Sequence, residues 1–239
     1  MAYHGYITFI GQFASSFNNP TVLEIGVDKG QTLFPVTNYF TKICNDGQRQ
    51  FLYTGVDILL RDHVKIASHY INDSNWASPS KTGLVQLIEG NSLEVMPKFI
   101  DNDVKYSTIL IDGDHNYHTV NKELNFALDI VHDRGIIVCD DYDGEGGSQN
   151  EYFAEQQGFY NESEINENIN NLITRELDSS SDKVGVKGAV DEFLQNNPEW
   201  GKYKFYTGAE PVVLYRKDRI ELSTLVQDEY AQITWKFLE

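Results

Sequence analysis

The sequence predicts an α/β fold, a three-layer sandwich around a seven-stranded, mostly parallel sheet that ends in an antiparallel hairpin. The first observation is that short apolar runs alternate with longer segments of helical period as far as Asn196, which is typical of a parallel sheet. The second is that the runs Lys202–Thr207 and Val212–Arg216 are joined by a connection too short for a crossover, so they should pair antiparallel. The third is a length of 239 residues, which suits one α/β domain.

Helices and strands are expected to alternate from the start of the chain. Apolar residues recur at helical spacing in the lead-in segment, and Asn19-Pro20 then precedes an apolar run. The polar stretch Asn72–Gly83 is expected to be a loop, and Ser92 should cap a short helix that Pro97 keeps from running far. We expect helices at Tyr6–Phe17, Gln31–Ile43 and Arg61–Ile71 and strands at Thr21–Gly26, Phe51–Asp57 and Leu84–Glu89.

The second half continues this alternation and then breaks it. We expect strands at Tyr106–Ile111 and Gly135–Cys139 and helices at Tyr117–Val131 and Val186–Asn196. Between the last strand and helix lies an acidic insertion, 142–185, which is rich in Glu, Asn, Ser and Gly. Long insertions of this kind are usually lids or disordered segments, and a helix is possible at 161–177.

The chain is expected to hold one domain, 21–217, which contains the acidic insertion. A lead-in helix in 1–20 precedes it, and a tail in 218–239 with no clear period follows it.

Composition excludes several classes of partner. The formal net charge is −17, and no basic patch offsets it, so nucleic acid and an anionic membrane surface are disfavoured. The two cysteines form no CxxC motif, and no run of about 18 apolar residues is present. With no signal-peptide pattern at the start, we expect a cytoplasmic protein that acts on a small molecule and that could form a homo-oligomer.

A candidate nucleoside site opens where the first strand ends. The run Val22–Gly30 leads from a strand into a turn with Gly26 and Gly30, whose missing side chains allow a ligand to approach the backbone. The next helix begins there and offers free N–H groups. Asp57 ends the second strand and is placed to accept both hydroxyls of a ribose. Structural glycines and a capping acid are the alternative explanation.

A second candidate site lies at the ends of the fourth and fifth strands. Asp112 follows one strand, and Asp140-Asp141 follow the other. Neighbouring strands lie about 4.8 Å apart, so these carboxylates should converge and raise one another's pKa values. A hard divalent cation such as Mg²⁺ would relieve the repulsion, with Asp114 as a possible replacement ligand. His115 is a candidate general base, and capping roles are the alternative for each residue.

The strand-turn-helix motif resembles that of class I S-adenosylmethionine-dependent methyltransferases, which have a Rossmann-like fold. The match is to an E-x-G-x-x-x-G variant, because Asp28 stands where a dinucleotide site has its middle glycine. The resemblance implies that Gly26 and Gly30 border the methionine part of the cofactor, that Asp57 holds the ribose and that Gly90-Asn91-Ser92 meets the adenine. The cofactor-site residues it implies are Glu24, Gly26, Gly30, Asp57, Asn91, Ser92 and Asp112.

The strand ends I-D-G-x-H and D-D resemble one branch of this class, which includes the macrolide-sugar O-methyltransferases. The catechol and caffeoyl-CoA O-methyltransferases are more distantly similar. The resemblance spans Thr21–Arg216 and implies a metal held by Asp112, Asp140 and Asp141, with Asp112 and His115 as catalytic residues. It implies methyl transfer to a hydroxyl of a sugar or catechol-like diol. Apart from the resemblance, the aromatic residues expected near the strand ends could close over the acceptor or could equally serve packing, namely Phe9, Phe13, Tyr142 and those in Tyr152–Tyr160.

Four alternatives stay open. The enzyme could use the cofactor without a metal, or the chain could bind the cofactor without catalysis. An NAD-dependent enzyme is disfavoured by the missing G-x-G-x-x-G motif and by the terminal hairpin. A nucleic-acid methyltransferase is disfavoured by the charge and by the Ile-Asp-Gly-Asp end of the fourth strand.

Overall fold

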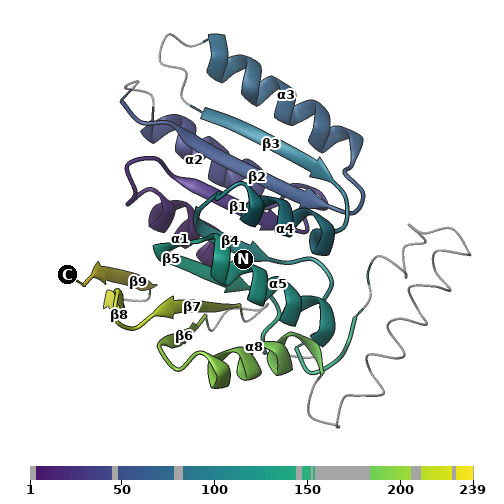
Figure 1. Cartoon of the computed structure of the whole chain (residues 1–239). Helices are drawn as coiled ribbons and strands as arrows, with labels where there is room; N and C mark the ends of the chain where they lie inside the picture. Colours follow the sequence, from purple (N-terminus) through teal and green to yellow (C-terminus); the bar gives the residue numbers. More distant parts are fainter. Residues whose placement is uncertain are drawn as a thin grey trace, which may run out of the picture.

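The computed structural model describes residues 4–44, 48–77, 83–143, 147–151, 153, 184–205, 211–227 and 230–238. Its main sheet has seven strands in the order β3-β2-β1-β4-β5-β7-β6, with helices on both faces (Figure 1). All neighbours are parallel except β7, which runs antiparallel to both β5 and β6. This confirms the predicted three-layer α/β sandwich with its terminal antiparallel hairpin.

The sheet strands are β1 (Thr21–Ile25), β2 (Phe51–Asp57), β3 (Gly83–Glu89), β4 (Tyr106–Ile111), β5 (Val131–Cys139), β6 (Trp200–Lys204) and β7 (Val212–Arg216). The helices are α1 (His4–Ala14), α2 (Leu33–Ile43), α3 (Asp62–Ala77), α4 (Ser92–Asp101), α5 (Tyr117–Ile130) and α8 (Gly185–Asn196). None of the helices in the described ranges is long and apolar enough to cross a membrane.

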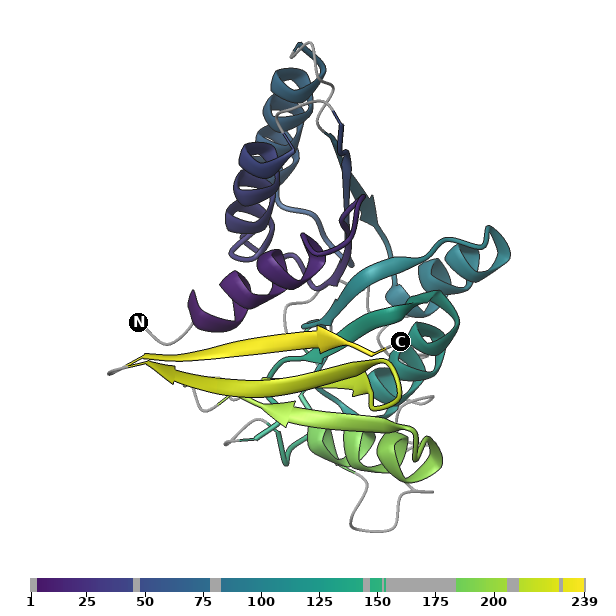
Figure 2. The same ribbon diagram turned by 90° about the vertical axis from the view of Figure 1, so that its left-hand side faces the viewer.

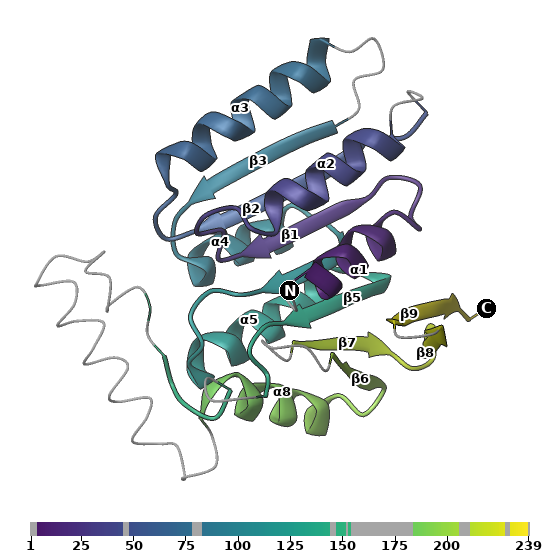
Figure 3. The same ribbon diagram turned by 180° about the vertical axis from the view of Figure 1, so that it is seen from behind.

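Two hydrophobic cores cover the two faces of the sheet. One lies under α4, α5 and α8, and the other lies under α1, α2 and α3 (Figures 1 and 3). Successive residues of β4 alternate between them, because Ile109 and Ile111 face the first core and Leu110 faces the second. Burial on both faces explains why the central strands are continuous apolar runs.

The C-terminal tail forms a second sheet, the hairpin of β8 (Ile220–Gln227) and β9 (Tyr230–Phe237). It lies beside α1 (Figure 2), where the Trp235 ring is 5.8 Å from Phe9 and 5.4 Å from Phe13, measured between ring centroids. Phe9 is 4% exposed and Phe13 is fully buried. The expectation that these two rings close over an acceptor is therefore wrong, because they hold the hairpin onto α1.

Some predicted boundaries need correction. Helix α3 continues to Ala77, so the first part of the expected loop 72–83 is helical. Asn91, not Ser92, caps α4, since its side chain accepts a hydrogen bond from the Leu93 N–H. Pro97 lies inside this helix, which runs on to Asp101. A proline removes one backbone hydrogen bond there, and burial of Val95, Met96 and Phe99 offsets the loss.

Most of the acidic insertion lies outside the described residues. This holds for the helix expected at 161–177 and, apart from Phe153, for the aromatic stretch at 152–160. Within it, the described residues 147–151 and 153 lie against the start of α5 and of α8, as the contacts of Asn150 with both helices show.

Candidate active site

The candidate site lies along the carboxyl ends of the parallel strands. Backbone register aligns Ile25 of β1 with Ile111 of β4, and Ile111 with Cys139 of β5. The next residue in each strand therefore falls in one row, which places Gly26, Asp112 and Asp140 side by side. Two hydrogen bonds hold this row, from the Asp112 N–H to the Ile25 carbonyl and from the Asp140 N–H to the Ile111 carbonyl.

The turn after β1 requires glycine. Gly26 has φ +87°, and a Cβ atom there would lie 2.0 Å from the carbonyl oxygen of Asp112. Gly30 has φ +76°, and a Cβ atom there would lie 2.6 Å from the Phe34 ring. Gly26 thus joins the first predicted site to the second, because its lack of a side chain lets the Asp112 backbone approach.

Asp57 organises this turn. Its Oδ2 accepts hydrogen bonds from the N–H groups of Val27 and Asp28, at 2.8 and 2.9 Å, and its Oδ1 accepts one from the Leu59 N–H. A carboxylate has about four acceptor positions. These three hydrogen bonds therefore leave little acceptor capacity for a ribose hydroxyl. The bonds also keep Asp28 at a positive φ of 39° beside the glycines.

Glu24 is enclosed beneath the turn. It is 1% exposed, and its Oε2 accepts a hydrogen bond from the Tyr53 hydroxyl at 2.7 Å. Burial raises the pKa of Glu24 well above its usual range. The Glu24 carboxyl is therefore buried and hydrogen-bonded beneath the turn, and its contact with a cofactor stays a prediction.

The two residues expected near adenine both have protein partners. The Asn91 side chain caps α4, as described above. The Ser92 hydroxyl donates to Oε1 of Glu123 on α5 at 2.5 Å. Both residues follow the carboxyl end of β3, and their contact with adenine stays a prediction.

His115 brings the metal-site candidates together. Its ring is 4% exposed, with Nε2 3.5 Å from Asp112 Oδ1 and Nδ1 3.2 Å from Asp141 Oδ2. Asp140 is 3% exposed, and its Oδ1 has no hydrogen-bond partner among the described residues. The predicted group Asp112, His115, Asp140 and Asp141 is thus one local cluster, although the structure does not test the role of each member.

Burial and mutual charge shift the pKa values in this cluster. Burial, together with the charges of Asp112 and Asp141, raises the pKa of Asp140 to about 9. Burial also raises the pKa of Asp112. Burial acts to lower the pKa of His115, but contacts with Asp112 and Asp141 outweigh it and raise that pKa to about 10. In this arrangement the imidazolium balances part of the carboxylate charge.

The carboxylates have the chemistry of a hard-cation site, but they are not arranged as a finished one. Among the residues that the structure describes, no three His, Cys, Asp or Glu side chains are spaced to hold a metal. Asp112 and Asp141 instead contact opposite nitrogens of His115. The donor set still fits Mg²⁺, because the atoms are carboxylate oxygens and the buried Oδ1 of Asp140 lacks a partner.

The segment after β5 adds contacts that the sequence did not indicate. His115 pairs with Glu151 through backbone hydrogen bonds, and the His115 ring lies edge-on to Phe153, with centroids 5.1 Å apart. Oδ1 of Asp114 accepts a hydrogen bond from the Phe153 N–H, so Asp114 anchors this segment. Asn150 accepts hydrogen bonds from the N–H groups of Tyr117 and Gly185. Phe153 lies in the aromatic stretch that the sequence singled out. Asn150 and Glu151 lie in a polar insertion without periodicity, so no local signal could have identified them.

Glu123 is a further residue that the sequence did not single out. It lies on the buried face of α5, between Val120 and Leu124, and is fully buried. The available signal in the sequence is its helical spacing, which places a carboxyl group on the apolar face of α5. Burial raises the pKa of Glu123 to about 8, and the charge of Asp114 adds to this.

A comparison with known proteins identifies the family of the chain. A family model described as a methyltransferase domain matches residues 23–142, half of the chain. A search of the curated proteins gives no match.

Solved structures share the fold at low identity. An O-methyltransferase from Bacillus cereus, in complex with S-adenosylhomocysteine, is 12% identical with a TM-score of 0.51, covering 89% of this chain and 80% of its own. The O-methyltransferase TomG from Streptomyces achromogenes, in complex with S-adenosylmethionine, is 10% identical with a TM-score of 0.50, covering 88% and 79%. An S-adenosylhomocysteine-bound methyltransferase from Podospora anserina is 15% identical with a TM-score of 0.50, covering 89% and 78%.

The family match begins at Leu23 within β1 and covers the glycine turn and the strand ends that carry Asp57, Asp112 and Asp140-Asp141. It therefore contains the parts of the chain in which the sequence predicted both sites. The chain belongs to the methyltransferase-domain family and has the fold of class I S-adenosylmethionine-dependent methyltransferases.

Proposed function

We propose that this methyltransferase transfers the methyl group of S-adenosylmethionine to a hydroxyl of a small molecule, a sugar or catechol-like diol, with the help of a divalent cation. The observation that carries the proposal is the cluster at the ends of β4 and β5. It places Asp112 and Asp141 against the two ring nitrogens of His115, with Asp140 in the same row of strand ends, directly beside the Gly26 turn. The nucleoside side and the acceptor side of the reaction then share one edge of the sheet.

The residues of the chain divide the work by position. Gly26 and Gly30 keep the turn open for the methionine part of the cofactor, and Asp57 holds that turn and has acceptor capacity toward a ribose. Asn91 and Ser92 border the adenine at the end of β3. Asp112, Asp140 and Asp141 would hold the cation. The buried, unpartnered Oδ1 of Asp140 supports this assignment.

A bound sulfonium supplies the electrophilic methyl group, and a divalent cation supplies the charge that lowers the pKa of an acceptor hydroxyl. His115 is the proton acceptor in this proposal. Its contacts with the two carboxylates favour the protonated ring in the structure. The ring can therefore accept a proton only when those carboxylates bind another partner, such as the cation. The metal and the base are thus linked in one site.

A metal-independent O-methyltransferase is the second candidate. It is favoured by the ring position of His115, which contacts Asp112 and Asp141 at the same time. An imidazolium in that place supplies positive charge without a cation. Asp112 and Asp141 would then orient the ring, and an acceptor hydroxyl would be bound by hydrogen bonds alone.

Two measurements test the proposal in sequence. Calorimetry with S-adenosylmethionine and S-adenosylhomocysteine should show binding at one site per chain. Methyl transfer to a panel of sugar diols and catechols should then require Mg²⁺ and stop after exhaustive EDTA treatment. Asp140→Asn should lower kcat/KM by about 100-fold or more, because a carboxylate ligand is lost.

Asp129→Asn is the matched control, since it makes the same change on the exposed face of α5. It should leave kcat/KM unchanged. Full activity in EDTA would reject the cation and favour the second candidate. Failure of both cofactor forms to bind would reject methyl transfer altogether.

A further inference from the structure

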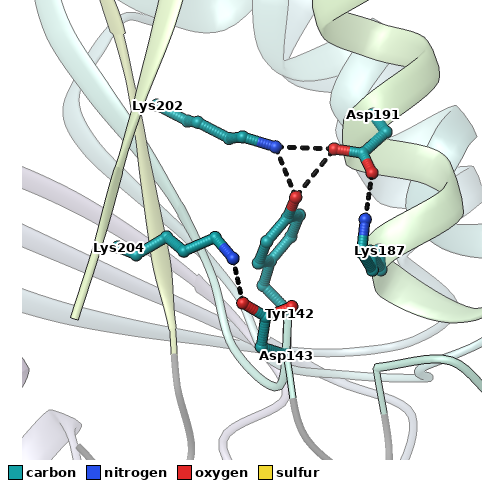
Figure 4. A network of polar contacts seen from close by, with 6 residues as sticks. All are labelled: Tyr142, Asp143, Lys187, Asp191, Lys202 and Lys204. Atoms are coloured by element: carbon teal, nitrogen blue, oxygen red, sulfur yellow. Dashed lines mark hydrogen bonds and ion pairs between the residues drawn. The ribbon is translucent and has the colours of Figure 1, made fainter. Parts of the chain in front are cut away.

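A basic cluster lies next to the candidate active site in a chain whose formal net charge is −17. We call it the Tyr142 cluster, and Figure 4 shows its members, Tyr142, Asp143, Lys187, Asp191, Lys202 and Lys204. The ammonium groups of the three lysines lie 5.3, 4.7 and 4.9 Å from the centroid of the Tyr142 ring. Three cations around one ring repel each other, so their convergence calls for an explanation.

Two carboxylates compensate only part of this charge. Asp191 on α8 accepts hydrogen bonds from Lys187, Lys202 and the Tyr142 hydroxyl, and Asp143 pairs with Lys204 (Figure 4). Three ammonium groups against two carboxylates leave one positive charge in the cluster.

The register of the sheet places this cluster at the same edge as the carboxylates. Lys204 of β6 and Cys139 of β5 both pair with Val212 of β7, so Lys204 lies in the last row before Asp140. Two strand spacings put the Cα atoms of Lys204 and Cys139 roughly 10 Å apart, and Asp140 is the next residue after Cys139. Tyr142 itself follows Asp141 in the chain. The distance suits a small molecule that contacts both the basic cluster and the strand-end carboxylates.

The lysines have hydrogen-bonding capacity to spare. An ammonium group has three N–H donors. Within the described part of the chain, Lys187 and Lys204 each form an ion pair with a single carboxylate, and their side chains are 41% and 34% exposed. Each can therefore donate to a further oxygen from the solvent side.

We infer that Lys187, Lys202 and Lys204 form a binding site for an anionic group of the methyl acceptor, a carboxylate or a phosphate. This inference rests on the proposed methyl transfer and narrows its acceptor. The anionic group binds the ammonium donors of β6 and of the first turn of α8, while the reacting hydroxyl lies toward Asp112 and Asp140. A neutral analogue of the same acceptor lacks this contact and binds more weakly.

Calorimetry on the protein saturated with S-adenosylhomocysteine tests the site without turnover. Inorganic phosphate and benzoate are the two probes, one for each kind of anionic group. At least one should bind saturably, once per chain, with a Kd near 1 mM or tighter. Lys204→Gln should weaken that binding by about fivefold or more, and Lys204→Arg should restore most of it.

Asp143→Asn gives a result of opposite sign, which a purely structural ion pair does not. It removes the carboxylate that competes for Lys204, so the anion should bind more tightly than in the parent chain. Lys105→Gln is the matched control. Lys105 pairs with Asp103 just before β4, at the amino ends of the parallel strands, so this substitution should leave anion binding unchanged.

Three results would overturn the inference. These are no saturable binding of either anion, equal losses in Lys204→Gln and Lys105→Gln, or weaker binding in Asp143→Asn. Thermal unfolding of each variant shows whether it is folded. The titration with S-adenosylhomocysteine separates the two proposals, since bound nucleoside without a bound anion rejects only this inference. Phosphate binding alone indicates a phosphorylated acceptor, and benzoate binding alone indicates a carboxylic acid.

Discussion

At the residue scale, Glu123 shows what burying a carboxyl group among apolar side chains costs. It is fully buried, its Oε1 accepts a hydrogen bond from Ser92, and its Oε2 has no partner among the described residues. Burial raises its pKa to about 8, far above the value of roughly 4.3 for a free side chain. Folding therefore requires this group to keep its proton at neutral pH.

The sign of the resulting pH dependence follows from linkage. Below about pH 4 both the folded and the unfolded forms of Glu123 are protonated. Between about pH 4 and 8 the unfolded state ionises while the folded state keeps its proton, so stability falls across this window and levels off above it. Glu123→Gln removes this loss. We expect the advantage of the variant in free energy of unfolding to grow by about 2 kcal/mol or more between pH 5 and pH 8.5.

Urea unfolding at both pH values measures this difference. Glu94→Gln is the control, because Glu94 is exposed on α4 and its substitution should produce no pH-dependent gap. A Glu123→Gln variant that is less stable than the parent at pH 8.5 would show that Glu123 is ionised and bound by a charge partner in the folded protein.

The sequence predicted site residues where a local pattern marks the end of a strand. Asp57, Asp112 and Asp140 each follow an apolar run, so the sheet geometry alone brings them to one edge. The partners of His115 and Asp114 in the 151–153 segment could not be predicted in this way. They depend on how a polar insertion returns to the sheet, which neither period nor propensity determines. The lysines of the Tyr142 cluster are also scattered in sequence and meet only through the register of β5, β7 and β6.

Among the secondary-structure elements, the β8–β9 hairpin is one that the hydrophobic periodicity of a single segment does not predict. Ile233, Trp235 and Phe237 alternate with polar residues, but so short a stretch does not by itself establish a strand. The pattern becomes meaningful only opposite α1, where apolar rings cover Phe9 and Phe13. The main sheet was predictable because its strands are buried on both faces, whereas this hairpin packs one face on a helix.

Trp235→Ala should therefore destabilise the fold. Fully buried aromatic residues cost about 3–5 kcal/mol on truncation to alanine, and Trp235 is only partly buried, so we expect about 2 kcal/mol. Urea unfolding measures the change, with the neighbouring exposed Lys236→Ala as control. Equal stability of the two variants would mean that the hairpin does not share in the cooperative fold.

At the scale of the whole molecule, charge imbalance opposes folding. The chain has 36 acidic residues against 19 basic ones, and several of the latter are already used in ion pairs such as Lys65–Glu89 and Lys204–Asp143. Salt screens both the general repulsion and these attractive pairs. Surface pairs contribute little each, so the repulsion among the unpaired carboxylates dominates.

Raising the salt concentration should therefore stabilise the protein. The Debye length falls from about 30 Å at 0.01 M to about 10 Å at 0.1 M, which is enough to screen acidic residues on different elements. We expect Tm to rise by about 3 °C or more between 0.01 and 0.3 M NaCl. Choline chloride should give the same rise, because screening does not depend on which monovalent cation is used. A rise with NaCl alone would indicate a specific cation site, and a fall in both salts would show that the attractive pairs outweigh the repulsion and carry much of the stability.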